Sequence, residues 1–183
     1  FRKDEYNIEA TKELVEMYNR QGNAMLEGNA SLDRGQLRGA ACLFRLVLWI
    51  DPNNCNASKQ LDMVLEKNDV NPGDFNTRVQ IGRKMESGMN LADAVVEYRR
   101  ALKIKDDTAL KVRLAEVIIQ LMHQNSRPPH SLRPDEAITL YREAISREPK
   151  LEYKFGLIKA YLDCSDYYKM LAREKMEDLS VSH

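Results

Sequence analysis

Hydrophobic positions recur every three or four residues along most of this chain, a spacing that is typical of amphipathic helices. The clearest example is the segment 91–105, whose apolar stripe consists of Leu91, Ala94, Val95, Tyr98, Ala101 and Leu102. The charged residues that fall between these positions are Asp93, Glu97, Arg99, Arg100 and Lys103. We expect the charged set mostly to face away from the stripe. Together with the segment 75–87 and a short polar turn, this stretch predicts a pair of helices that cannot bury its stripe alone.

The same reading predicts an all-α chain of about nine helices and no strand. The expected helices cover residues 3–27, 36–50, 57–67, 75–87, 91–105, 108–124, 134–146, 151–162 and 166–179. Asp74 is a plausible N-cap, and Pro134 suits the first turn of a helix. Residues 28–35 and 125–133 are rich in turn-forming residues and are expected to be loops, and the tail 180–183 is expected to fray.

Three of the expected helices share one register. Each carries an alanine four residues before an aromatic ring, and these pairs are Ala40 with Phe44, Ala94 with Tyr98, and Ala137 with Tyr141. Three residues after each ring stands Val47, Ala101 or Ala144, and a helix stop follows at Pro52, Asp106 or Pro149. Three matches in one register, each with a helix stop, indicate an internal repeat.

This register resembles the tetratricopeptide repeat, which joins a first-helix W-x2-L-G-x2-Y pattern to a second-helix A-x3-F and a closing proline. The first-helix pattern is matched by Ile81-Gly82 with Met85, by Leu114-Ala115 with Ile118, and by Tyr18, Gly22 and Met25. Leu157, Ala160 and Tyr161 look like a fourth first helix. The resemblance implies a right-handed superhelical solenoid of antiparallel helix pairs, in which small residues mark close backbone approaches and large ones fill the neighbouring gaps.

On this resemblance, residues 1–183 form one helical-repeat domain. Its repeats cover residues 11–54, 75–107, 108–150 and a degenerate 151–179. The expected loops lengthen the first repeat by about six residues and the third by about ten, relative to the usual ~34. The expected helix at 57–67 has no partner in this scheme and is interpreted as a linker helix or a decayed repeat.

The resemblance also implies a function. In arrays of this family the first helices line a concave groove that binds an extended peptide or a helix of a partner protein. The groove positions correspond to Asn19, Asn23, Asn76, Val79, Arg83, Glu86, Val112 and Glu116. Members that clamp a chaperone's C-terminal carboxylate place lysines in this groove, whereas the clamp positions here hold Asn19, Asn23, Gln80, Ala109 and Arg113. A carboxylate clamp needs several cationic donors, so this sequence argues against one.

The main hypothesis is therefore a non-catalytic protein–protein interaction module or scaffold. A second hypothesis is a structural subunit that stays buried in a larger complex, which exposed Met, Tyr and Leu outside the helix–helix stripes would favour. A third is helical-repeat RNA binding, for which the supporting basic set is Arg99, Arg100, Lys103, Lys105, Lys111 and Arg113. Lys+Arg and Asp+Glu balance at 28 each, and this zero net charge argues against a nucleic-acid partner.

Chemistry-bearing motifs are scarce. Three histidines without carboxylate or cysteine at ligand spacing favour no metal site, and no glycine-rich phosphate loop or nucleophile elbow is present. We therefore expect no cofactor, no small-molecule substrate and no enzymatic activity. Three widely spaced cysteines are typical of free thiols in an intracellular, reducing compartment. No apolar run approaches the roughly 18 residues of a membrane span.

Overall fold

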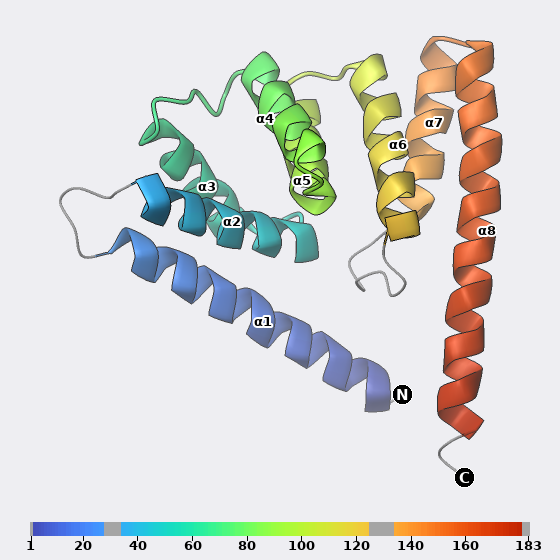
Figure 1. Ribbon diagram of the computed structural model, residues 1–183, viewed down its shortest axis with the longest axis horizontal. Helices are drawn as coiled ribbons and strands as arrows, with labels where there is room; N and C mark the ends of the chain where they lie inside the picture. The colour runs from blue at the N-terminus through green and yellow to red at the C-terminus, as the bar shows by residue number, and fades with distance from the viewer. Residues whose placement is uncertain (1, 28–33, 125–133, 181–183) are drawn as a thin grey trace. The chain divides into compact units, whose positions relative to one another are not determined.

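The computed structural model describes residues 2–27, 34–124 and 134–180 and is all-α in these ranges, as predicted (Figure 1). The described residues contain eight helices and no strand. The helices are α1 (Arg2–Leu26), α2 (Arg34–Ile50), α3 (Cys55–Glu66), α4 (Phe75–Ser87), α5 (Leu91–Ile104), α6 (Thr108–Gln124), α7 (Pro134–Arg147) and α8 (Leu151–Ser180). None of them combines the length and the apolarity that a bilayer crossing needs.

The prediction of nine helices is wrong at the C-terminus. The segments expected at 151–162 and 166–179 form one continuous helix, α8, which runs through Asp163, Cys164 and Ser165. These three residues have only moderately unfavourable helix propensities and include neither glycine nor proline, so they do not end a helix on their own. The loops expected at 28–35 and 125–133 fall mostly outside the described residues, although Arg34 and Gly35 belong to α2.

The chain divides into two compact units, Phe1–Lys105 and Asp106–His183. In the first unit α1 pairs with α2, α4 pairs with α5, and α5 also packs against α2. Helix α3 packs on α2 and touches α1, so the helix that was interpreted as an unpaired linker has two neighbours. In the second unit α7 lies between α6 and α8, and the three helices run side by side (Figure 1). The assignment of all 183 residues to one domain stays a prediction.

In each of these two helix pairs of the first unit, a glycine of one helix packs against an aromatic ring of the other. A Cβ atom built on Gly22 would lie 2.7 Å from the Phe44 ring, and one on Gly82 would lie 2.4 Å from Cε1 of Tyr98. Both rings are fully buried. No side chain larger than hydrogen fits at either glycine without a shift of the ring, because real Cβ contacts are never that short. The predicted pairing of small and large residues is confirmed in α1–α2 and α4–α5.

The third ring of the register makes its close contact elsewhere. A Cβ atom on Gly156 of α8 would lie 2.4 Å from Cε1 of Tyr141 on α7. The repeat register did not include Gly156, because the match on this helix rested on Leu157, Ala160 and Tyr161. Tyr141 is buried there, and burial followed by the charge of Glu116 raises its pKa to about 12. Ring-against-small-residue packing is kept in the second unit, but between different helices.

Two helix starts in the first unit are fixed by side-chain caps. Asp74 accepts hydrogen bonds from the Thr77 backbone N–H and hydroxyl, each at 2.7 Å, which confirms it as the N-cap of α4. The same bonds lower the pKa of Asp74. Asn54 caps α3 by accepting from the Ala57 N–H at 3.0 Å. The direction and start of α4, the helix that carries half of the predicted groove residues, are therefore set locally.

Candidate functional site

A group of charged side chains lies inside the first unit, where the sequence predicted none. Arg45 of α2, Arg78 of α4 and Glu97 of α5 are 4%, 1% and 0% exposed. The expectation that Glu97 faces away from the apolar stripe is wrong. Helix α5 packs against α4 on one side and α2 on another, so a residue outside the main stripe is still enclosed. A charge in such a place persists only when it is paired.

Both oxygens of the Glu97 carboxylate are engaged. Oε1 accepts from Nε of Arg45 at 2.6 Å, and Oε2 accepts from Nη1 of Arg78 at 2.8 Å. These are charge-assisted hydrogen bonds at the short distances expected for N–H donors to a carboxylate. One acid thus joins helices α2, α4 and α5, and we call Arg45, Arg78 and Glu97 the buried charge triad.

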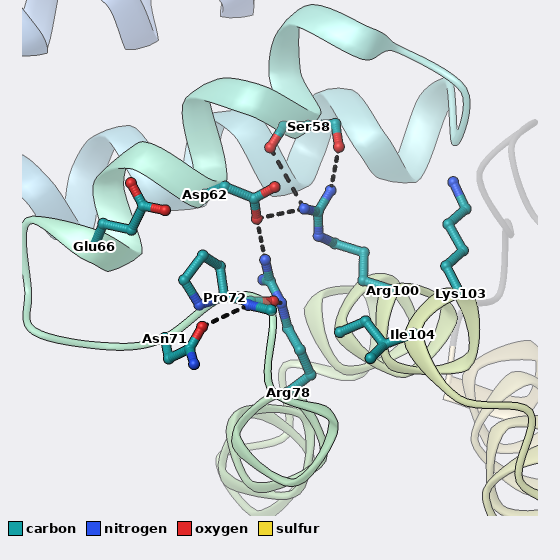
Figure 2. A pocket seen from close by; sticks show the side chains of 10 residues that line it. Ser58, Asp62, Glu66, Asn71, Pro72, Arg78, Arg100, Lys103 and Ile104 are labelled. Atoms are coloured by element: carbon teal, nitrogen blue, oxygen red, sulfur yellow. Dashed lines mark hydrogen bonds and ion pairs between the residues drawn. The ribbon is translucent and has the colours of Figure 1, made fainter.

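The triad continues into a pocket between α3 and α5 (Figure 2). Arg78 donates from Nε to the carbonyl oxygen of Pro72 at 3.0 Å, and both Arg78 and Arg100 donate to the same oxygen of Asp62. Arg100 also donates from Nη1 to the hydroxyl of Ser58 at 2.6 Å. Burial, followed by the neighbouring charge of Arg78, lowers the pKa of Arg100. The wall of the pocket is therefore a fixed ionic network that ties α3 to α4 and α5.

The pocket has a volume of about 430 Å³, which is within the range of ordinary ligand sites. Its lining residues are Ser58, Asp62, Glu66, Asn71, Pro72, Gly73, Arg78, Arg100, Lys103 and Ile104. This lining contains three basic and two acidic side chains but no histidine or cysteine. Its one hydroxyl, on Ser58, is held by a guanidinium rather than by a base. The arrangement suits polar contact with a partner better than nucleophilic chemistry.

The groove residues predicted on α4 are placed along a single helix. Asn76 and Arg83 are exposed, whereas Val79 and Glu86 are half-buried. Glu86 accepts from the Tyr98 hydroxyl at 2.7 Å, so its carboxylate helps to hold α4 on α5. Within the first unit α4 packs principally against α5, and Asn76 and Arg83 point away from that contact.

The other predicted groove residues lie on α1 and α6. Asn19 of α1 accepts from the side-chain amide of Asn56 at 3.4 Å, which places it beside α3. Asn23 is half-buried, and its Oδ1 is enclosed without a hydrogen-bond partner among the described residues. Val112 and Glu116 lie on α6 in the second unit, where Glu116 accepts from Arg113 at 2.7 Å.

Two members of the basic set proposed for RNA contact are used inside their own units. Arg100 is tied to Asp62 and Ser58, as described above. Lys111 of α6 is paired with Asp106 at 2.7 Å and Glu143 at 2.6 Å. These bonds raise the pKa of Lys111, and those from Lys111 and Arg147 lower the pKa of Asp106. The six residues are therefore not one free basic face.

One signal in the sequence points to the buried charge triad. Arg45 interrupts the most apolar stretch of the chain, residues 40–50, and a charge there requires a buried partner. The identity of that partner is not in the local pattern, because Glu97 is 52 positions away on another helix.

No protein-family model matches the chain, and no curated protein matches it. No group of three or more metal-ligating side chains occurs within residues that the structure describes.

Proposed function

We propose that this chain is a non-catalytic protein–protein interaction module of the tetratricopeptide type, which binds a peptide segment or a helix of a partner protein. The observation that carries the proposal is the open side of α4. Asn76, Val79 and Arg83 recur there at steps of three and four residues, and within the first unit α5 is the only helix that packs extensively on α4. We call these three residues the α4 face.

The α4 face is held rigidly from behind. The Gly82–Tyr98 contact, the Arg78–Glu97 hydrogen bond and the Glu86–Tyr98 hydrogen bond all join α4 to α5. A surface whose backbone is already fixed loses little conformational entropy on binding, so more of the contact energy appears as affinity.

The side chains of the α4 face define the kind of partner. Arg83 offers a planar set of donors that suits a carboxylate, Asn76 offers an amide, and Val79 offers a small apolar area between them. A partner helix that presents an acidic residue and an apolar residue one turn apart complements this spacing. Helical and extended segments with that pattern are the expected ligands.

The proposal is tested by affinity capture with tagged wild-type chain, quantified by mass spectrometry. Arg83→Glu reverses the one charge of the α4 face and is expected to abolish capture of the specific partner. Lys59→Glu makes the same charge change at an exposed position on α3 and serves as the matched control. Equal capture by all three proteins would show that the α4 face is not the binding surface.

The second candidate, a structural subunit of a larger complex, is supported by a specific observation on α8. Leu151, Phe155, Ile158 and Leu162 are all exposed, although large apolar side chains in one row are unusual on the surface of a monomer. A monodisperse monomer of the isolated chain, seen in size-exclusion chromatography with light scattering, would count heavily against this candidate.

A further inference from the structure

Helix α8 carries apolar side chains on two opposite sides. On one side Gly156 meets the Tyr141 ring, the Cys164 thiol donates to the Pro134 carbonyl oxygen at 3.5 Å, and Ala160 is fully buried. The other side carries large apolar residues that are more than half exposed, namely Leu151 (66%), Phe155 (62%), Ile158 (56%) and Leu162 (62%). Their steps of four, three and four residues form one straight row on a helix. We call this row the α8 stripe.

We propose that the α8 stripe pairs with the α8 stripe of a second copy of this chain, in antiparallel orientation, to form a homodimer. A two-fold interface matches each residue with a partner symmetrically. Antiparallel pairing about the middle of the stripe places Phe155 against Ile158 of the second copy and Leu151 against Leu162 of the second copy. All layers of such an interface are apolar, as the a and d positions of a coiled coil require.

The charged residues beside the α8 stripe favour a second copy of the chain as the partner, and they favour antiparallel pairing of the two helices. Glu152 and Lys159 lie on the same side of the stripe, two turns apart, and neither makes an ion pair within the described part of the chain. Antiparallel pairing brings Glu152 of each copy next to Lys159 of the other. Parallel pairing brings the Lys159 side against the side that carries Lys154, which is a like-charge contact. A second copy therefore complements the stripe in charge as well as in apolarity.

The size of the stripe sets the strength of the dimer. A single row of four apolar residues with charged flanks covers less than the about 800 Å² per partner of a standard stable interface. Tyr161, on one flank of the stripe, is 43% exposed, with the Arg142 guanidinium over its ring. The dimer is therefore expected to be reversible and to depend on protein concentration.

This inference does not depend on the proposed partner-binding function. The α8 stripe belongs to the second unit and the α4 face to the first, so each can fail without the other. Capture of a partner tests the α4 face, and the mass of the purified chain in solution tests the α8 stripe.

The test is sedimentation equilibrium of the purified chain over a wide range of concentrations. The wild-type mass is expected to rise from 21.1 kDa towards twice that value. Ile158→Glu should remain a monomer at every concentration, while its far-ultraviolet circular dichroism and melting temperature stay those of the wild type, because Ile158 is exposed. A wild-type chain that stays monomeric, or an Ile158→Glu variant that still dimerises, would overturn the proposal.

A charge exchange tests the orientation. Glu152→Lys alone and Lys159→Glu alone each create two like-charge contacts per antiparallel dimer and should weaken it several-fold. The double variant Glu152→Lys with Lys159→Glu restores opposite charges and should recover the wild-type dissociation constant. Single variants that dimerise as well as the wild type, or a double variant that is weaker than both, would rule out antiparallel pairing.

Discussion

The most informative perturbation of this fold is Glu97→Gln. The substitution keeps the size of the side chain but removes the negative charge that Arg45 and Arg78 share at 2.6 and 2.8 Å. Arg78 keeps its bonds to Pro72 and Asp62, so the loss falls mainly on Arg45, which is 4% exposed. Breaking a buried ion pair by removing one partner costs about 3–5 kcal/mol, and we expect a loss near the lower end, about 3 kcal/mol. That is a large fraction of the roughly 5–15 kcal/mol that stabilises a typical domain.

The assay uses the single tryptophan of the chain. Trp49 lies on α2 and is buried, so its fluorescence during urea unfolding reports on the first unit. With a urea dependence of about 1–3 kcal/mol per molar, a loss of about 3 kcal/mol lowers the midpoint by about 1–3 M. Glu66→Gln, which neutralises an exposed carboxylate of the neighbouring pocket, is the matched control and should change stability by less than about 0.5 kcal/mol.

A second substitution separates the charge effect from a general loss of packing. Arg45→Met in the Glu97→Gln background removes the cation that was left without its partner, and should recover part of the lost stability. A wild-type midpoint for Glu97→Gln, or a double variant that loses the sum of both single effects, would refute the reasoning that the triad is held by charge pairing.

Four further expectations follow from the geometry. Gly82→Ala should lower stability by about 1–3 kcal/mol, because its Cβ would meet the Tyr98 ring. Gly88→Ala, whose Cβ would make only ordinary contacts at 3.5 Å or more, should change it by less than about 1 kcal/mol in chemical unfolding. Ala94→Glu should abolish the cooperative melt of the first unit, because Ala94 is fully buried and the new carboxylate would be a buried, unpaired charge. An unchanged melt would show that the repeat register is wrong. Because the pKa of Asp74 is lowered in the folded chain, its cap stabilises the fold at pH values above the ordinary pKa of 3.8, and this stability is lost as the pH falls through the lower folded-state pKa. The difference in unfolding midpoint between wild type and Asp74→Ala should therefore shrink in acid. A difference that stays constant with pH would contradict the cap. The Cys164 thiol, whose pKa is raised to about 11 by burial and then by nearby carboxylates, should react with an aromatic disulfide reagent only after unfolding, whereas the two exposed cysteines react in the folded chain.

The local pattern of apolar, turn and capping residues was sufficient to predict most of the helices. The predicted helices at 75–87 and 108–124 coincide with α4 and α6, because turn residues and caps bound an apolar period on both sides. The single miss in helix count, within α8, came from treating Asp163-Cys164-Ser165 as a stop. A short polar run without glycine or proline is a weak terminator when the flanking turns are packed on a neighbouring helix.

Tertiary relations were predictable only where the repeat register encoded them. The register marked Phe44 and Tyr98 as rings that fill gaps beside small residues, and Gly22 and Gly82 do meet these rings, whereas the approach of Gly156 to Tyr141 lies outside the matched positions. The buried charge triad was beyond local reasoning, since its residues are separated by 52 and 19 positions and occupy three helices. Period alone also could not show which of the two apolar sides of α8 is packed, because both sides recur at helical spacing.

The most direct test of the proposed interaction module is the affinity of the captured partner segment, measured by titration calorimetry against wild type and Arg83→Glu. The α4 face predicts that a helix or peptide from the captured protein binds the wild type and loses at least about tenfold in affinity on Arg83→Glu, which corresponds to about 1.4 kcal/mol. Lys59→Glu should bind like the wild type. Equal affinities for all three proteins would contradict the assignment of the α4 face as the binding surface.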